Sequence, residues 1–332
     1  FYENLTATEE FILAGLSENP QLKTLLFFLF LVIYSLTIVE NALLIAVISH
    51  SVKLCSPMYV FLRQLSFIDI CYSSSVSIRM LLDFLSETRS ISMVGCSLQM
   101  LSYAGFGGSE CFLLAAMSYD RYVAICHPLT YLQIINGQTI TAMLLASYMG
   151  GFLNGFIQTG FSFFHLKFCG PQQYIHHFYC DVIALIEISC GNTSINEVIL
   201  LSLVGFIELS SLLVILISYL CIIVAVLRIK SSEGRKKAFS TCASHLAVVS
   251  LFYGTIMFMY LRPSSAYSPE QDKVVSVFFT VIIPFLNPLI YSLRNREVIQ
   301  SARDLFRLIK YPLTKRTFGY FFTGFNCGKL KC

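Results

Sequence analysis

The sequence predicts an all-α membrane protein, a bundle of seven transmembrane helices followed by a short amphipathic helix. Of its 332 residues, 56% are hydrophobic and only 13% are charged, whereas soluble domains carry about 25% charged residues. Seven apolar segments follow one another, each close to the roughly 20 residues that a helix needs to cross the hydrocarbon core. No Gly- or Pro-rich linker divides the chain. A single bundle follows from these observations.

The segments are connected by short stretches, except for His165–Glu197. They are expected at Leu25–Ile48, Pro57–Phe84, Cys96–Ile125, Thr139–Phe164, Val198–Leu227, Phe239–Leu261 and Lys273–Tyr291. This division gives an N-terminus at 1–24, the bundle at 25–291, an amphipathic helix at 292–310 and a tail of unknown role at 311–332.

The distribution of basic residues predicts the orientation. Lys and Arg gather in the fifth connection and after Arg294, and basic residues favour the cytoplasmic side. The sequons at Asn4 and Asn192 then lie outside, where glycosylation occurs. We therefore expect a multi-pass plasma-membrane protein with an extracellular N-terminus and a cytoplasmic C-terminus.

Four cysteines fall on the oxidising side in this orientation, an even number that suits disulfide bonds. Three pairings are open for Cys96, Cys169, Cys180 and Cys190.

Three acids lie inside the predicted helices, where charged groups are costly and indicate function. Asp69 is about 18 Å above the inner end of its segment, and Glu110 is about 16 Å above Arg121. Two carboxylates at one depth are expected to bind a cation or share a proton; the alternative is that each is a neutral packing group. Glu208 either lines a cavity or forms a hydrogen bond across the bundle.

The seventh segment contains PFLNPLIYSLRN. Pro284 and Pro288 remove backbone donors, so we expect a kink with free carbonyls, flanked by the polar groups of Asn287 and Tyr291. After it, apolar residues recur among basic ones at the spacing of an amphipathic helix on the inner leaflet: Val298, Ala302, Leu305 and Ile309.

Other chemistries find little support. The chain contains no HExxH, GxSxG or phosphate-loop motif. The stretch HHFYCD, with His176, His177, Cys180 and Asp181, could hold a metal, but ordinary loop histidines are favoured because Cys180 is expected in a disulfide.

The stretch MSYDRYVAIC places Asp120 and Arg121 at the inner membrane boundary. Arg121 lies 25 residues after Cys96, about 38 Å along a helix, where its charge reaches water, headgroups or a protein partner. Adjacent residues do not share a helix face, so Asp120 alone is not expected to satisfy Arg121.

Together with KAFSTCASH, PFLNPLIYSLRN, SPMYVFLRQLSFIDICYSS and EFILAGLS, this stretch resembles the olfactory receptors of the rhodopsin-like class of G-protein-coupled receptors. The resemblance runs from about Asn4 to Lys310. It departs at Glu40, where the family usually has Gly, and at Ile78-Arg79, where Pro-Lys is usual.

The resemblance implies roles for individual residues. Disulfides would join Cys96 to Cys180 and Cys169 to Cys190. Asp69 and Glu110 match a sodium pocket, and no other cofactor is expected. Coupling and activation would involve Asp120, Arg121, Tyr122, Tyr219, Lys237, His245, Asn287, Pro288 and Tyr291.

The implied ligand is a small volatile odorant in the outer half of the bundle. The pocket would include Tyr103, Ala104, Gly107, Gly108, Val204, Ile207, Tyr253, Ile256, Tyr260 and Thr280. An apolar lining with a few hydroxyls suits a mostly hydrophobic molecule; the alternative for these residues is helix packing.

The other implied partners are membrane lipids and a heterotrimeric G protein of the stimulatory olfactory type, which raises cAMP through adenylyl cyclase. The expected location is the cilia of olfactory neurons, and no nucleic-acid partner is expected. A transporter or channel would predict inverted repeats or paired broken helices, and neither is visible. An enzyme is not expected, because no supporting glycine motif flanks the two carboxylates.

Overall fold

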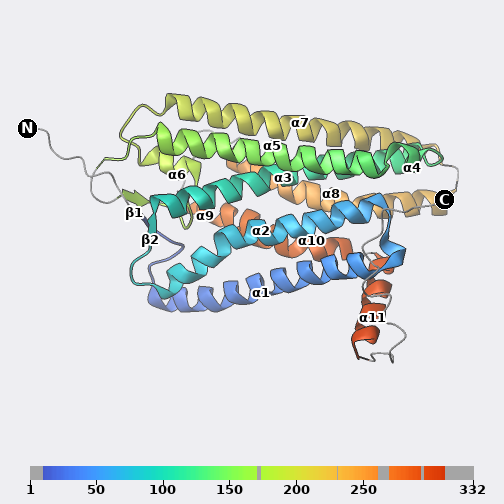
Figure 1. The fold of residues 1–332 in the computed structure, drawn as a ribbon, viewed down its shortest axis with the longest axis horizontal. Helices are drawn as coiled ribbons and strands as arrows, with labels where there is room; N and C mark the ends of the chain where they lie inside the picture. The colour runs from blue at the N-terminus through green and yellow to red at the C-terminus, as the bar shows by residue number, and fades with distance from the viewer. Residues whose placement is uncertain (1–9, 170–172, 230, 261–268, 293–294, 311–332) are drawn as a thin grey trace, which may run out of the picture.

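The computed structural model describes residues 10–169, 173–229, 231–260, 269–292 and 295–310. Its long helices run side by side along one axis (Figure 1). They are α1 (Pro20–His50), α2 (Pro57–Leu85), α3 (Met93–Cys126), α5 (Gly137–Phe164), α7 (Ser194–Leu227), α8 (Ser232–Tyr260) and a last span built from α9 (Pro269–Val277), η3 (Phe278–Ile282) and α10 (Ile283–Ser292). All seven predicted segments are helical, and the helical bundle is confirmed.

Local caps set the helix starts that the apolar pattern placed too late. α1 begins at Pro20 because the Asn19 side chain accepts hydrogen bonds from the N–H groups of Gln21 and Leu22, and proline suits the first helical position. In the same way, α3 begins at Met93 because the Ser92 hydroxyl accepts the N–H of Gly95. Hydropathy reports the apolar length, whereas the caps define where each helix begins.

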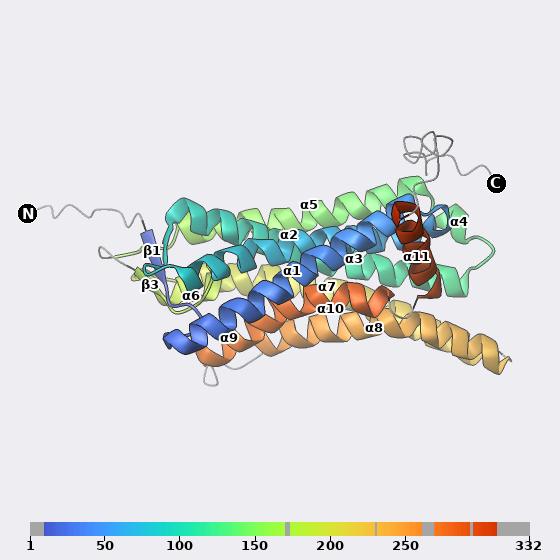
Figure 2. The same cartoon turned by 90° about the horizontal axis from the view of Figure 1, so that it is seen from below.

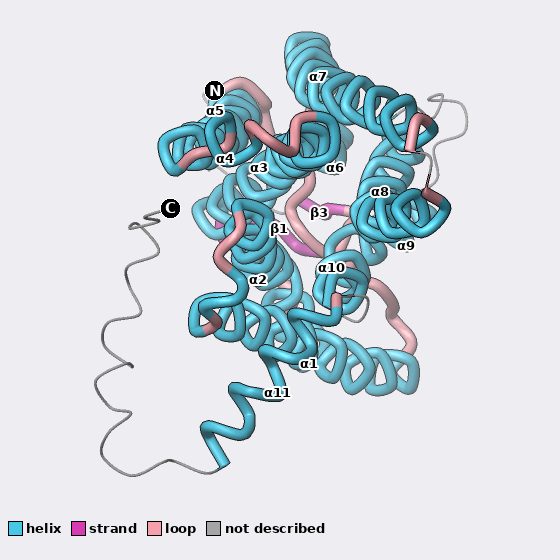
Figure 3. The backbone as a smooth tube through the Cα atoms, turned by 90° about the vertical axis from the view of Figure 1, so that its right-hand side faces the viewer, coloured by secondary structure: helices cyan, strands magenta, loops and turns pink. Residues whose placement is uncertain are grey.

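Five helical stretches among the described residues are long and apolar enough to cross a membrane: α1, α2, α5, α7 and Glu270–Ser292. α3 is not among them, since it carries polar residues such as Gln99, Ser109 and Glu110. These side chains are buried, and α3 contacts α2, α5, α7 and α8 (Figure 3). Protein rather than lipid surrounds these groups. α8 contributes a shorter apolar stretch, Cys242–Phe258.

Glycines allow α3 and α5 to approach closely. A Cβ added to Gly151 would lie 2.3 Å from the backbone nitrogen of Ser109 and 2.5 Å from the carbonyl of Gly105. A Cβ added to Gly155 would lie 3.0 Å from the nitrogen of Gly105. Small residues let membrane helices pack backbone to backbone, so this pair of helices depends on them.

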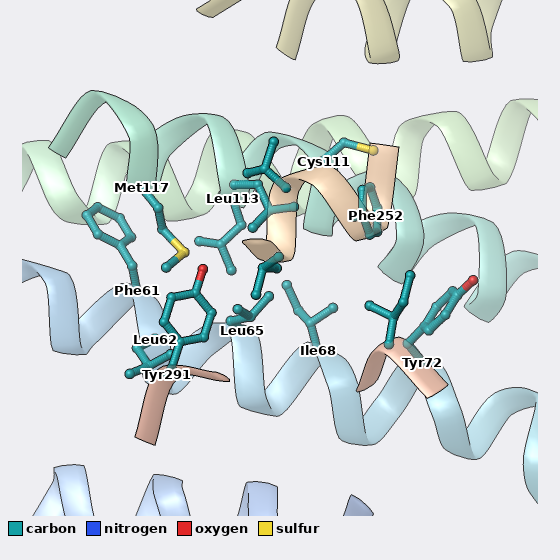
Figure 4. Packing of buried hydrophobic residues seen from close by; sticks show 14 of the residues in the cluster. Phe61, Leu62, Leu65, Ile68, Tyr72, Cys111, Leu113, Met117, Phe252 and Tyr291 are labelled. Carbon is teal, nitrogen blue, oxygen red and sulfur yellow. The ribbon is translucent and has the colours of Figure 1, made fainter. Parts of the chain in front are cut away.

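Apolar side chains fill the interior of the bundle. Figure 4 shows Leu62 and Leu65 of α2 facing Leu113 and Met117 of α3, with Tyr291 of α10 beside them. Leu62, Leu65 and Leu113 are at most 1% exposed. This packing fixes the helices that carry the polar groups described below.

The last span is interrupted as its prolines predict. Pro288 has no N–H to donate to the carbonyl of Pro284, four residues earlier, and the Asn41 side chain donates to that carbonyl instead at 3.0 Å. Pro284 likewise leaves the carbonyl of Thr280 without its helical partner, and this residue lies in η3, a π-helical turn. The break is thus a π-helical turn with one carbonyl satisfied from α1.

A small sheet at one end of the bundle was not anticipated. β1 (Glu10–Leu13) lies between β2 (Ser90–Ser92), to which it is antiparallel, and β3 (Gln173–Ile175), to which it is parallel. Strands of three or four residues carry too little alternation to be seen in sequence. The sheet lies at the end of the bundle opposite α11 (Figure 2).

At the other end, α11 (Arg296–Lys310) leaves the bundle axis (Figure 1). Its apolar side is directed inward, with Val298 buried. The Tyr59 hydroxyl of α2 donates to Glu297 at 2.8 Å, and Lys53 of η1 (Val52–Leu54) pairs with Asp304 at 3.5 Å. The predicted amphipathic helix is present and is held against the bundle.

Replacing Gly151 by Leu should prevent α3 and α5 from closing, because the added side chain would overlap the α3 backbone. We expect little of the protein at the cell surface, measured by flow cytometry of an N-terminally tagged chain. Gly160→Leu on the same helix is the control, since nothing lies within 4 Å of its Cβ position. Equal surface levels of the two variants would contradict this account of the interface.

Candidate functional site

A cavity lies between α3, α5, α7 and α8 and holds about 470 Å³ of unfilled space, its open mouth included. From the predicted set it is lined by Tyr103, Ala104, Gly107, Gly108, Val204, Ile207 and Ile256. It is also lined by Cys111, Asn154, Gln158, Glu208 and Phe279. The lining is mostly apolar with a few polar groups, as is usual for small-molecule sites.

Three predicted pocket residues are not among those lining residues. The Thr280 hydroxyl donates to the carbonyl of Ser276 within its own span at 2.8 Å. The Tyr253 hydroxyl donates to Ser211 of α7 at 2.6 Å and is buried between helices. The side chain of Tyr260 lies outside the described residues. The hydroxyls of Thr280 and Tyr253 therefore donate their hydrogen bonds to other groups of the protein instead of facing the cavity.

The α5 wall of the cavity was missed by sequence reasoning. Asn154 and Gln158 lie four residues apart, so they share a helix face, and the Gln158 amide donates to the Asn154 side chain at 2.8 Å. Two carboxamides at this spacing in an apolar segment were a visible signal. The sequence did not show, however, that this face turns toward α3 and α7.

The connection between α5 and α7 packs against α3 next to the cavity. Its Tyr179 is fully buried, with its ring centroid 5.1 Å from that of Tyr103. The Gln99 side chain accepts the N–H of Cys180 at 3.0 Å. Both implied disulfides are formed, Cys96–Cys180 with Cα atoms 5.5 Å apart and Cys169–Cys190 with Cα atoms 6.1 Å apart. The connection is therefore fastened to α3 and closed on itself.

Of the two glycosylation sequons, the structure describes the one at Asn192. Asn192 is exposed just ahead of α7, near the sheet end of the bundle. Asn4 lies outside the described residues.

His177 and Asp181 of this connection are both buried, which disfavours the charged form of each and shifts their pKa values in opposite directions. Burial, together with the charge of Lys273, lowers the pKa of His177 to about 3. Burial raises the pKa of Asp181 to about 6, with Asp272 adding to the rise and backbone N–H groups opposing it. The histidine ring contacts the Ser276 hydroxyl, with Nε2 at 3.3 Å. His177 is therefore neutral, which suits a packing group.

In the middle of the bundle, one amide joins the two acids that the sequence paired by depth. Asn287 Nδ2 lies 3.0 Å from Asp69 Oδ1, 3.2 Å from Asp69 Oδ2 and 3.4 Å from Glu110 Oε1. All three residues are at most 1% exposed. Within the described residues, no three His, Cys, Asp or Glu side chains are grouped to hold a metal ion. A cation here would have two carboxyl groups and the Asn287 carbonyl oxygen, which has no hydrogen-bond partner.

At the inner end, Asp120 is paired with a residue other than its neighbour. Its carboxylate accepts the hydroxyl of Tyr131, from the short helix α4 (Tyr131–Ile134), at 2.7 Å. In the part of the chain that the structure describes, Arg121 forms no ion pair, and its Nη2 is buried without a hydrogen-bond partner. Asp120 therefore does not satisfy Arg121, as their adjacency on the helix led us to expect, and α4 supplies the partner of Asp120.

The other predicted coupling residues lie around this inner end. The Tyr219 hydroxyl is 2.7 Å from Nδ1 of His245, with the two rings stacked. Tyr122 contacts His127 at 3.2 Å. Tyr291 is buried, and its hydroxyl has no hydrogen-bond partner in the described part of the chain. Pro288 lies within α10, and Lys237 lies on α8 with a side chain outside the described residues.

Comparison with known proteins agrees with this architecture. The family model for olfactory receptors matches residues 30–307. Olfactory receptor 5AP2 of Mus musculus is 51% identical over 303 residues, which cover 91% of this chain and 95% of the relative. Human olfactory receptor 5AP2 is 50% identical over 302 residues, and human olfactory receptor 5AR1 is 49% identical over 303 residues, 97% of its length.

The fold and the site define a multi-pass helical membrane receptor with a cavity between its helices and polar groups at the end of the bundle near α11. The chain belongs to the olfactory receptor family. Its class therefore binds odorants and couples to G proteins, and it is not an enzyme.

The buried His177 should make the protein less stable as the pH falls. Its folded pKa of about 3 is below the usual value of about 6.5, so the two states differ only below about pH 6.5, where the unfolded chain takes up a proton that the folded chain does not. Between about pH 7.5 and about pH 5 the loss is on the order of 2 kcal/mol.

The test compares the apparent melting temperature of wild type and His177→Phe in detergent at the two pH values. Asp181 contributes with the opposite sign, because its raised pKa stabilises the fold as the pH falls, but it is common to both proteins and cancels. We expect the wild type to lose more stability than the variant on acidification. Parallel losses would show that His177 is protonated in the folded state.

Proposed function

We propose that this chain is an odorant-activated receptor that signals through a stimulatory olfactory-type G protein and raises cAMP. The cavity between α3, α5, α7 and α8 is the observation that carries the proposal. Its α3 lining residues run from Tyr103 to Cys111, between Cys96 and Arg121 along the helix. Arg121 itself does not line the cavity, so the ligand site and the coupling end are separate. Its largely apolar lining suits small, mostly hydrophobic odorants.

The inner end is where the G protein would bind. Arg121 has a guanidinium nitrogen without a partner, and the stacked Tyr219 and His245 join α7 to α8 beside it. Outward movement of α8 would open a space for the C-terminal helix of the G-protein α subunit. Tyr219 and Tyr291 would then turn inward, with Asn287 and Pro288 at the joint of the last span.

The proposed orientation has the N-terminus outside and the C-terminus in the cytoplasm, in the plasma membrane of olfactory cilia. The disulfides and the exposed Asn192 lie in or beside the start of α3 and the connection that leads to α7. These elements lie at the end opposite α11 (Figure 1) and support this orientation. The amphipathic α11 would lie on the inner leaflet, where basic residues attract anionic lipids.

We further propose that Asp69 and Glu110 attract a sodium ion. The amide nitrogen of Asn287 lies within hydrogen-bond distance of both buried carboxyl groups. The side-chain oxygen of Asn287, Oδ1, has no hydrogen-bond partner in the described part of the chain. Carboxylate and carbonyl oxygens are the donors that hard cations prefer.

Replacing Arg121 by Ala should reduce the odorant-evoked cAMP response by about tenfold or more, because charge-assisted hydrogen bonds are worth roughly 1.5–3 kcal/mol. The measurement is a cAMP reporter in cells exposed to an odorant panel. Arg303→Ala is the control, since Arg303 is exposed on α11. An undiminished response at equal surface level would exclude Arg121 from coupling.

Surface level is measured with an antibody against an N-terminal tag on intact cells. The same staining tests the orientation, because a cytosolic N-terminus would be stained only after permeabilisation.

Asp69→Asn and Glu110→Gln should each lower the sodium sensitivity of basal cAMP, because each removes one of the two charges that attract the cation. Basal signalling is measured in membranes with sodium replaced by an inert large cation. Glu18→Gln, on the exposed outer surface, is the control. If both variants reach the surface and keep the sodium response of the wild type, there is no cation site here.

A further inference from the structure

Glu208 occupies an unusual place for an acid in a membrane helix. It lies on α7 and lines the cavity next to Ile207. In the described part of the chain its carboxyl group forms no ion pair and no hydrogen bond, although its backbone carbonyl accepts the hydroxyl of Ser211 at 3.1 Å. The side chain is half-buried and reaches the cavity without a protein partner.

The hydroxyl of Tyr253 on α8 is already used. It donates to Ser211 at 2.6 Å and approaches the carbonyl of Cys111 at 3.4 Å. No Lys, Arg or His is among the described residues that line the cavity. The Glu208 carboxyl is therefore available to a donor group of a ligand in the cavity.

The α5 side of the same cavity carries further polar atoms. Gln158 donates one hydrogen bond to Asn154, and within the described residues the Asn154 amide nitrogen and the Gln158 carbonyl oxygen form no other. The cavity is thus apolar along α3 and α8 and polar where α5 and α7 contribute Asn154, Gln158 and Glu208.

This asymmetry selects among small ligands. A carboxyl group in poorly hydrated surroundings is costly unless it is hydrogen-bonded or paired. A ligand whose head group donates a hydrogen bond removes that cost, whereas an ether or hydrocarbon leaves it in place. A ligand carboxylate would add repulsion between like charges.

We propose that Glu208 is a specificity residue of this cavity, selecting small apolar molecules that carry one amine or alcohol head group to donate a hydrogen bond to its carboxyl. The inference rests on the proposed odorant site and deepens it. The apolar body lies along α3 and α8, and the head group lies between Glu208 and the Asn154–Gln158 pair.

The test uses linear n-alkyl compounds matched in number of heavy atoms, which differ only in the head group: primary amine, primary alcohol, methyl ether and carboxylic acid. Each is applied over a concentration series to cells carrying the full chain and a cAMP reporter. The wild type should respond to the amine, the alcohol or both, and more weakly to the ether and the acid.

Two variants separate charge from hydrogen bonding. Glu208→Gln keeps an acceptor without charge, so it should shift the half-maximal concentration of the amine upward on the order of 10- to 100-fold and leave the alcohol little changed. Glu208→Leu removes the acceptor and should weaken both, by about tenfold for the alcohol. Glu197→Gln, an exposed acid on the same helix, is the control.

A loss that follows either pattern supports the proposal and identifies the head group. Silence toward the whole matched series at normal surface level overturns it, as does a preference for the ether or acid, or responses that Glu208→Leu leaves unchanged. If the Glu208 proposal is overturned but the protein responds to other odorants, its proposed function as an odorant receptor still holds. If no odorant is effective and basal cAMP equals that of Arg121→Ala, the proposed function fails as well.

Discussion

In the middle of the bundle, the amide nitrogen of Asn287 donates toward both Asp69 and Glu110, which brings α2, α3 and α10 to one point. Polar groups in a membrane interior must find partners inside the protein, and this requirement orders the surrounding contacts. Nearby, Asn41 satisfies the carbonyl that Pro288 leaves free, which adds α1 to the same region. Four spans are therefore held at one depth by groups that would each be costly alone.

The two ends of the bundle are held together by different kinds of contact. At the outer end, disulfides and the three-stranded sheet fasten the loops over the cavity, with Tyr179 against Tyr103. At the end near α11, contacts are non-covalent, such as the hydrogen bonds of Asp120 with Tyr131 and of Tyr219 with His245 and the ion pair of Lys53 with Asp304. Covalent closure suits a fixed ligand site, and reversible contacts suit an end that must open for a G protein.

The spans, the location of four cysteines at one end of the bundle and the depth of the two acids could be predicted from sequence. Each of these predictions rests on local composition or on distance along one helix. The depth argument brought Asp69 and Glu110 together, and the structure adds Asn287 between them. The partner of Asp120 could not be predicted in this way, since Tyr131 belongs to a helix of four residues with no apolar period. The same holds for the strands of the outer sheet.

The sequence by itself determined the order and approximate extent of the seven membrane spans, because hydropathy and prolines act within a few residues of where they stand. Only the tertiary structure decided which helix faces meet. It turned Asn154, Gln158 and Glu208 toward one cavity and left Thr280 and Tyr253 bonded within the protein. Rotation of a helix about its axis leaves its hydropathy unchanged, and here it is set by side-chain packing such as the close approach of Gly151 to α3.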